Sequence, residues 1–301
     1  MWSDRSNFNK RIILPYKILL CAAIIVILYL LLNRQDTKLE TFRSLGFREP
    51  LTKSRVIALS LDSEYMDMAM PYIIYLPAGY GEGKAYSVWY GLNSYSTDEA
   101  MWIHNGIATA ADEMIEAGEI SPIIMVFPYT KDATIKEITK DLEDGKVDER
   151  NIDQFITKEL LPYIDSHYYS VAKPEGRFIG GFSLGGMIAL RIAFHHTELF
   201  SKVGGYSPAM ISSDYSDLQL EKWLYPNEDF DDIETFDKEH GFCKLQVWLD
   251  AGNSNDPFSV GIQSLYEGLQ KRGIPSKFEL YDGGHTLRKD RIKDYLKFYA
   301  G

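Results

Sequence analysis

Short apolar runs alternate with amphipathic stretches along most of the chain. The strand-like runs are rich in β-branched and aromatic residues, and glycine or proline marks many junctions. The expected strands are 55–61, 64–76, 86–90, 122–128, 176–181, 202–206, 244–249 and 277–281, and the expected helices are 107–117, 151–169, 184–195, 260–272 and 290–299. Because alternating strands and helices form βαβ units, the pattern predicts an α/β fold with a mostly parallel, doubly wound sheet.

One segment near the start has a different pattern. Residues 12–32 are almost uniformly apolar, with Lys17 as their single charge, and as a helix they would be about 31 Å long, close to the thickness of a bilayer's hydrocarbon core. The run ends without the small-residue site of a cleaved signal peptide. We therefore expect a basic tail (1–11), one transmembrane anchor (12–32), a stalk (33–50) and a single catalytic domain (51–301).

Charge separates the anchor region from the domain. The whole chain has a formal net charge of −11, and residues 1–32 are basic, so the domain is strongly acidic and nucleic acid is an unfavourable partner. Basic residues slightly favour a cytoplasmic N-terminus and a domain outside the cytoplasmic membrane. They are Arg5, Lys10, Arg11 and Lys17 before or within the span and Arg34, Lys38 and Arg43 after it. The two cysteines, Cys21 and Cys243, form no disulfide framework within one domain.

The motif Gly181-Phe182-Ser183-Leu184-Gly185 lies between an expected strand and an expected helix. A serine in such a turn has a strained backbone, and side chains at the two glycine positions would collide there. The helix that follows begins at the site, so the amide of Leu184 can face developing negative charge. The motif therefore predicts Ser183 as a nucleophile.

A nucleophilic serine needs a base, and His285 is the best placed of the six histidines. It follows the expected strand 277–281 in a glycine-bounded loop, at the carboxyl edge of the sheet. The other histidines precede the serine, lie about 18 Å further along its helix, or occupy a polar interval. They are His104 and His167, then His195 and His196, then His240.

Three aspartates compete as the acid that orients the base. Asp250 ends the expected strand 244–249, Asp256 lies in the loop that follows, and Asp282 almost adjoins His285. Asp256 is preferred because its loop can reach the histidine, Asp250 remains an alternative, and Asp282 is expected to shape the turn. With Asp256 or Asp250 as the acid, the chain order is the Ser…Asp…His of the α/β hydrolases.

The domain resembles the putative esterase family of α/β hydrolases, the group of esterase D, enterochelin esterases, feruloyl esterases and mycolyltransferases. The motifs that carry the resemblance are 74–80, 88–92, 122–128, 159–164, 180–186, 250–252, 255–256 and 283–285. The resemblance implies an α/β-hydrolase fold, Ser183 as nucleophile, Asp256 as acid and His285 as base. It also implies an oxyanion hole formed by the amides of Leu92 and Leu184. The acyl-transfer mechanism of such a triad needs no metal or organic cofactor.

The expected function is that of a membrane-anchored serine carboxylic ester hydrolase that acts through an acyl-enzyme on a small-molecule, glycan or lipid ester. One alternative is an acyltransferase, in which a sugar or lipid hydroxyl replaces water. Another is an inactive surface-binding module, which Tyr90 (where many relatives have histidine) and a longer loop before Asp256 would favour. Candidate substrate-binding residues are Tyr95 and Trp102, which are equally compatible with the core, and Trp223 in the segment 208–240.

Overall fold

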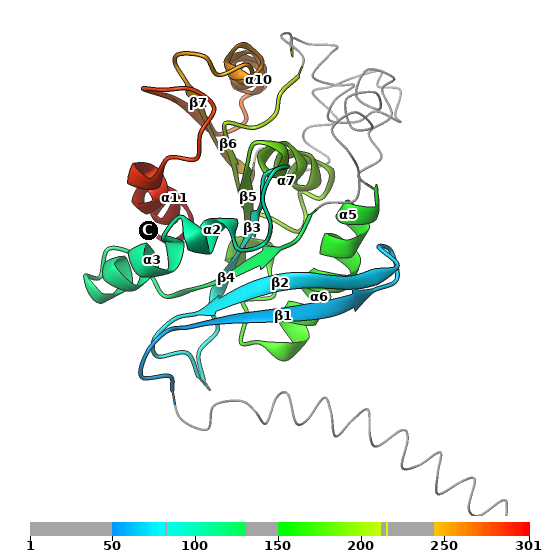
Figure 1. Cartoon of the computed structure of the whole chain (residues 1–301), viewed down its shortest axis with the longest axis vertical. Coiled ribbons are helices and arrows are strands. Elements are labelled where there is room, and N and C mark those ends of the chain that lie inside the picture. The colour runs from blue at the N-terminus through cyan, green and yellow to red at the C-terminus, as the bar shows by residue number, and fades with distance from the viewer. Residues whose placement is uncertain (1–49, 82, 131–149, 212–214, 216–243) are drawn as a thin grey trace, which may run out of the picture. The chain divides into compact units, whose positions relative to one another are not determined.

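The computed structural model describes residues 50–81, 83–130, 150–211, 215 and 244–301 (Figure 1). The expected tail, the anchor at 12–32 and the stalk up to residue 49 lie outside these residues. Across the described ranges, no helix is long and apolar enough to cross a membrane.

An eight-stranded sheet forms the centre of the fold, in the order β1-β2-β4-β3-β5-β6-β7-β8. The strands β1 and β2 form an antiparallel hairpin, and β2 also pairs antiparallel with β4. All other neighbours are parallel, so the predicted mostly parallel α/β sheet is confirmed. The strands are β1 (Arg55–Ser63), β2 (Met68–Leu76), β3 (Ser87–Leu92), β4 (Ile123–Pro128), β5 (Arg177–Phe182), β6 (Lys202–Tyr206), β7 (Gln246–Gly252) and β8 (Ser276–Tyr281).

Helices cover both faces of the sheet (Figure 1). The helices α3 and α11 pack against each other over one face, and α7 packs on β3, β5 and β6 on the other. The helices are α2 (Met101–His104), α3 (Ile107–Glu116), α5 (Arg150–Gln154), α6 (Leu161–His167), α7 (Leu184–His195), α10 (Ser259–Lys271) and α11 (Ile292–Ala300). Short 3₁₀ turns occur at η2 (Pro174–Gly176) and η4 (Lys289–Arg291).

Most predicted elements occur within a few residues of their expected bounds, and the differences have local causes. The expected strand 64–76 begins only at Met68, because a turn that ends with Asp67 at a φ of 50° precedes it. The expected single helix 151–169 is α5, a π-helical segment η1 (Phe155–Leu160) and α6 in succession. The four-residue helix α2 was not predicted, since one turn carries no helical periodicity.

Period-two alternation in β3 shows how the sheet is buried on both faces. Trp89 belongs to the core cluster under α3 and α11, where it stacks on Tyr299 with ring centroids 4.8 Å apart. The next residue, Tyr90, is also fully buried and contacts Phe200 edge to face at 6.5 Å. With both faces buried, the polar residues that could perform chemistry are left at the carboxyl ends of the strands, as is usual in parallel sheets.

Candidate active site

Ser183 occupies the sharp turn between β5 and α7, with φ 57° and ψ −121°. A Cβ atom on Gly181 would lie 2.4 Å from the carbonyl carbon of Gly185, so the two glycines let the strand and the helix approach closely. The Ser183 amide donates to the carbonyl of Tyr206 at 3.0 Å, and the Ser183 carbonyl accepts from the amide of Ala209 at 3.0 Å. The side chain is thereby held at the carboxyl end of the sheet and stays partly exposed.

The end of β3 lies against the first turn of α7. A Cβ atom on Gly185 would lie 2.7 Å from the carbonyl oxygen of Leu92 and 2.4 Å from that of Asn93. The Leu92 carbonyl accepts a hydrogen bond from the indole N–H of Trp102 at 3.2 Å. The backbone of Leu92 is therefore held beside the residues that follow Ser183.

His285 lies in the loop after β8 and reaches Ser183. Its Nε2 is 2.8 Å from the Ser183 Oγ. Phe182 stacks on the imidazole at 5.0 Å between ring centroids, and Phe258 meets it edge to face at 4.9 Å. The Tyr281 hydroxyl contacts the carbonyls on both sides of His285, at 3.2 Å and 3.1 Å, which holds the loop in place. The ring is thus fixed in a plane that points Nε2 at the serine.

Asp256 lies on the other side of the imidazole, in the loop after β7. Its Oδ1 is 3.4 Å from the Nδ1 of His285, and its side chain has no exposed surface. Burial raises the pKa of Asp256, but the neighbouring His285 and hydrogen bonds from Ser207 and the amides of Gly252 and Phe258 outweigh it and lower that pKa to about 2. The carboxyl group is therefore ionised at neutral pH.

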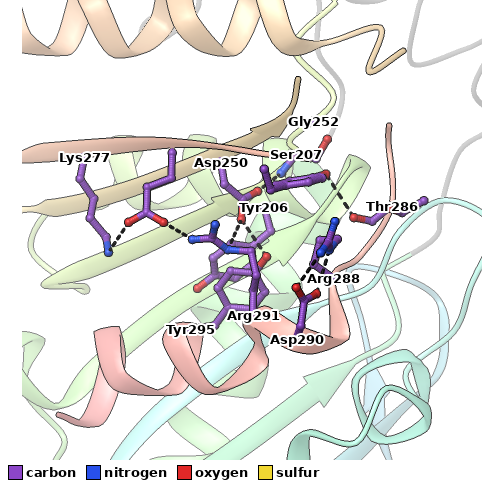
Figure 2. A network of polar contacts seen from close by, with 12 residues as sticks. Tyr206, Ser207, Asp250, Gly252, Lys277, Thr286, Arg288, Asp290, Arg291 and Tyr295 are labelled. Atoms are coloured by element: carbon purple, nitrogen blue, oxygen red, sulfur yellow. Dashed lines mark hydrogen bonds and ion pairs between the residues drawn. The ribbon is translucent and has the colours of Figure 1, made fainter. Parts of the chain in front are cut away.

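The other two aspartates have different partners. Asp250 is fully buried and accepts hydrogen bonds from the Ser207 amide at 2.8 Å and the Tyr295 hydroxyl at 2.7 Å, with Arg291 4.0 Å away (Figure 2). Burial raises its pKa to about 6 despite these contacts. Asp282 is exposed and accepts from the side-chain amide of Asn253 at 2.6 Å, which shapes the turn as expected.

Ser207, which is not among the predicted site residues, lies between Asp256 and His285. It directly follows β6 with a φ of 42°, is fully buried, and its Oγ is 2.8 Å from the His285 Nδ1. The same hydroxyl donates to Asp256. One signal was available. Ser207 directly follows β6, the neighbour of the strand that leads to Ser183, and the carboxyl ends of adjacent parallel strands converge on one site.

Of the three predicted substrate-binding residues, one is partly exposed, one is buried and one lies outside the described residues. Tyr95 is partly exposed in the loop after β3. Trp102 is fully buried, and its indole N–H binds the carbonyl of Leu92. Of the two alternatives given for this residue, the structure therefore has the core position. Trp223 and most of the segment 208–240 lie outside the described residues. Within the part of the chain that is described, no three histidine, cysteine, aspartate or glutamate side chains form a group that could hold a metal ion.

Known proteins with similar sequences and folds include esterases. Esterase Rv1288 from Mycobacterium tuberculosis is 25% identical over 253 residues, which are 73% of this chain and 53% of that protein, so the chain spans about half the length of this relative. A solved ferulic acid esterase superposes with a TM-score of 0.67 at 21% identity, covering 82% of this chain and 98% of its own. The S-formylglutathione hydrolase FrmB from Staphylococcus aureus has a TM-score of 0.58 at 16% identity, covering 84% and 97%. These structures share the α/β-hydrolase fold.

The family comparison covers the same region. The model of the family described as "Esterase: Putative esterase" matches residues 63–289. This range contains all strands from β2 to β8 and the residues around Ser183, Asp256 and His285. The chain therefore belongs to the putative esterase family.

Proposed function

We propose that this esterase hydrolyses carboxylic esters with Ser183 as nucleophile, His285 as general base and Asp256 as the acid that orients the base. The observation that carries the proposal is the 2.8 Å separation of the Ser183 Oγ and the His285 Nε2 in a partly exposed turn. That distance is within the range needed for proton transfer in catalysis. The ionised Asp256 on the opposite side of the ring supports the assignment of the acid.

The reaction has two steps. As the Ser183 Oγ bonds to the ester carbonyl carbon, its proton passes to the His285 Nε2, and the leaving alcohol then takes that proton as the ester C–O bond breaks. In the second step water gives a proton to His285 as its oxygen attacks the acyl-enzyme. The acid is released and Ser183 recovers its proton.

The amides of Leu92 and Leu184 are the proposed oxyanion hole. The close approach of the Leu92 and Gly185 backbones supports this assignment, since it brings the end of β3 beside the start of α7. One such donor typically contributes about 2.7–4 kcal/mol to transition-state stabilisation. Because the donors are backbone groups, Tyr90 in place of the family's histidine does not remove one.

For substrate, we infer a small-molecule ester with an aromatic acyl group as the first class to test. A ferulic acid esterase among the proteins of similar fold motivates this choice. Tyr95, partly exposed after the oxyanion loop, is the described side chain we assign to the pocket, and Trp223 remains a further candidate.

The experiment is hydrolysis by the full-length chain in detergent of p-nitrophenyl acetate and methyl ferulate, with Ser183→Ala as control. Turnover that is lost in Ser183→Ala is the expected result. Equal turnover by both proteins would remove Ser183 as the nucleophile. Addition of sugar or lipid alcohols tests the acyltransferase alternative, because an acceptor would form a new ester and raise the rate of alcohol release. Absence of labelling by a fluorophosphonate, together with no turnover, would instead favour the inactive binding module.

We also propose that residues 12–32 anchor the enzyme in a membrane, with the catalytic domain outside the cytoplasm. The support is the length and apolar composition of this segment and the distribution of basic residues around it. The full-length chain should stay in the membrane fraction after carbonate extraction, and a variant that lacks 12–32 should be released. Protease added to intact cells should cleave the domain, and protection of the domain would reverse the proposed orientation.

A further inference from the structure

The hydroxyl of Ser207 contacts both the acid and the base of the proposed triad. Its Oγ is 2.8 Å from the His285 Nδ1, and it donates to the Asp256 Oδ2. The direct pair, His285 Nδ1 and Asp256 Oδ1, is 3.4 Å apart. Since N–H···O hydrogen bonds are normally 2.7–3.2 Å long, the shorter route from base to acid passes through the serine.

Counting hydrogens fixes the direction of this route. The Asp256 carboxylate is ionised and can only accept, so the single Ser207 hydrogen points to Asp256. The Ser207 oxygen can then only accept from His285, which requires the ring hydrogen on Nδ1. Nε2 is consequently left unprotonated and faces the Ser183 Oγ, which is the tautomer that a general base needs.

Ser207 is itself held firmly in place. Its amide donates to both the side chain and the backbone carbonyl of Asp250, at 2.8 Å and 3.1 Å, and the side chain of Asp250 is held in turn by Tyr295 (Figure 2). The residue has no exposed surface, so its hydroxyl cannot meet a substrate and is not a second nucleophile. Its role must therefore be exerted through His285 and Asp256.

We propose that Ser207 is a positioning residue that links Asp256 to His285 and fixes the ring hydrogen of the base on Nδ1. This inference rests on the proposed function of Ser183, His285 and Asp256. Ser207 then becomes a fourth residue of the arrangement, and the carboxyl group of Asp250 binds its amide.

The test uses Ser207→Gly and Ser207→Ala in the full-length protein, with Ser63→Ala as a matched control. Glycine accepts the positive φ at this position and keeps the amide bond to Asp250, so Ser207→Gly removes the hydroxyl without straining the backbone. Ser63 is also a buried serine whose hydroxyl donates to a carboxylate, that of Glu159, but it lies on β1. The measurements are kcat, KM, the thermal midpoint, and the low-field proton NMR resonance of the imidazole N–H.

We expect kcat to fall about 10- to 100-fold in both Ser207 variants, with little change in KM. Ser207→Gly should lower the thermal midpoint by only a few degrees, since Asp256 keeps its bonds from the amides of Gly252 and Phe258. Its low-field imidazole resonance should shift or disappear. Ser63→Ala should retain kcat. A structural role predicts a different result, because glycine would then restore the activity lost in the alanine variant.

Several results would overturn the inference. They are a wild-type kcat in Ser207→Gly, an unchanged imidazole resonance in that variant, a rise in KM at constant kcat, or an equal loss of kcat in Ser63→Ala. Ser183→Ala in the same assay distinguishes failure of the proposed function from failure of the proposed role of Ser207. If that variant keeps the wild-type rate, the triad itself is wrong; if it is inactive while Ser207→Gly is fully active, only the role of Ser207 is wrong.

Discussion

Asp250, within β7, and Asp256, in the loop that follows, are both buried, but their surroundings give them opposite acidities. Burial raises the pKa of Asp250 to about 6, and the contacts with Tyr295, Ser207 and Arg291 only partly counteract it. For Asp256, burial also raises the pKa, but the hydrogen bonds that its two oxygens accept lower it to about 2. At Asp256 the hydrogen-bond donors outweigh burial, whereas at the more deeply buried Asp250 they do not, and this balance determines which carboxylate stays ionised.

This difference separates a structural carboxylate from one suited to catalysis. The acid of a triad has to remain charged while the imidazole gains a proton, because it stabilises the imidazolium that forms. Asp256 meets that requirement at neutral and mildly acidic pH. Asp250 titrates near pH 6, and its described partners are Ser207, Tyr295 and Arg291, not the imidazole. The order of Asp250 and Asp256 along the chain does not reveal which of the two stays ionised beside the imidazole.

The largest expected effect is that of Asp256→Asn. An asparagine amide beside Nδ1 favours the wrong tautomer of His285, so kcat should fall about 10³- to 10⁴-fold. Asp250→Asn is the matched control and should retain kcat within about tenfold, since its contacts stabilise Ser207 and Tyr295 rather than the imidazole. Steady-state kinetics on p-nitrophenyl acetate measure both. The reverse order of losses would make Asp250 the acid.

The two carboxylates should also give opposite dependences of stability on pH. Since folding raises the pKa of Asp250, this group stabilises the protein below about pH 4, and that contribution of about 2–3 kcal/mol is lost as pH rises to about 6. Since folding lowers the pKa of Asp256, its contribution of about 2 kcal/mol is present above pH 4 and is lost as pH falls to about 2.

Urea unfolding from pH 2 to 7 measures this difference. Asp250→Asn should remove the decline in unfolding free energy between pH 4 and 6, and Asp256→Asn should remove the decline below pH 4. A slope between pH 4 and 6 that is unchanged in Asp250→Asn would contradict the assignment of the raised pKa.

Gly252→Ala tests the segment that joins the two carboxylates. A Cβ atom there would lie 2.3 Å from the carbonyl oxygen of Gly283, so the end of β7 and the His285 loop would have to separate. We expect a loss of about 1–3 kcal/mol in unfolding free energy, together with a lower kcat. Chemical denaturation and steady-state kinetics measure the two effects. A variant with wild-type values for both would show that the loop can move without harm.

The smallest expected effect is that of Tyr295→Phe. It removes one donor from Asp250, so the pKa of that carboxyl should rise further and the unfolding free energy should fall by about 1 kcal/mol. The fall in stability near pH 6 should move to higher pH in the same urea series. Tyr299→Phe, a buried tyrosine bonded to Tyr206 instead, should leave the position of that fall unchanged.

The sequence predicted the fold and the strand–turn–helix around Ser183 because their signals are local. Helix α7 occurs at the expected residues 184–195, and the Gly181 and Gly185 contacts match the steric reason given for the motif. The choice between Asp250 and Asp256 could not be settled in the same way. It depends on how far a loop reaches across β7 and β8, and loop geometry is not a periodic property of the chain.

Ser207 was missed for a related reason. A serine followed by proline after a strand has the composition of an ordinary turn, and nothing nearby along the chain marks it as a partner of His285. Its contacts come from residues 43, 49 and 78 positions away. The π-helical segment η1 was likewise not predictable, because its apolar spacing resembles that of the helices on either side.

Residues 206–209 hold both the proposed nucleophile and the proposed base. The carbonyl of Tyr206 and the amide of Ala209 bind the backbone of Ser183, and the hydroxyl of Ser207 binds His285. A fluctuation that opens this short segment therefore releases Ser183 and His285 together, and the amides of Ser183, Ser207 and Ala209 should exchange with deuterium at a common rate. Under the proposed mechanism, a molecule in which these four residues are open is inactive, so the fraction of active molecules reports their opening equilibrium.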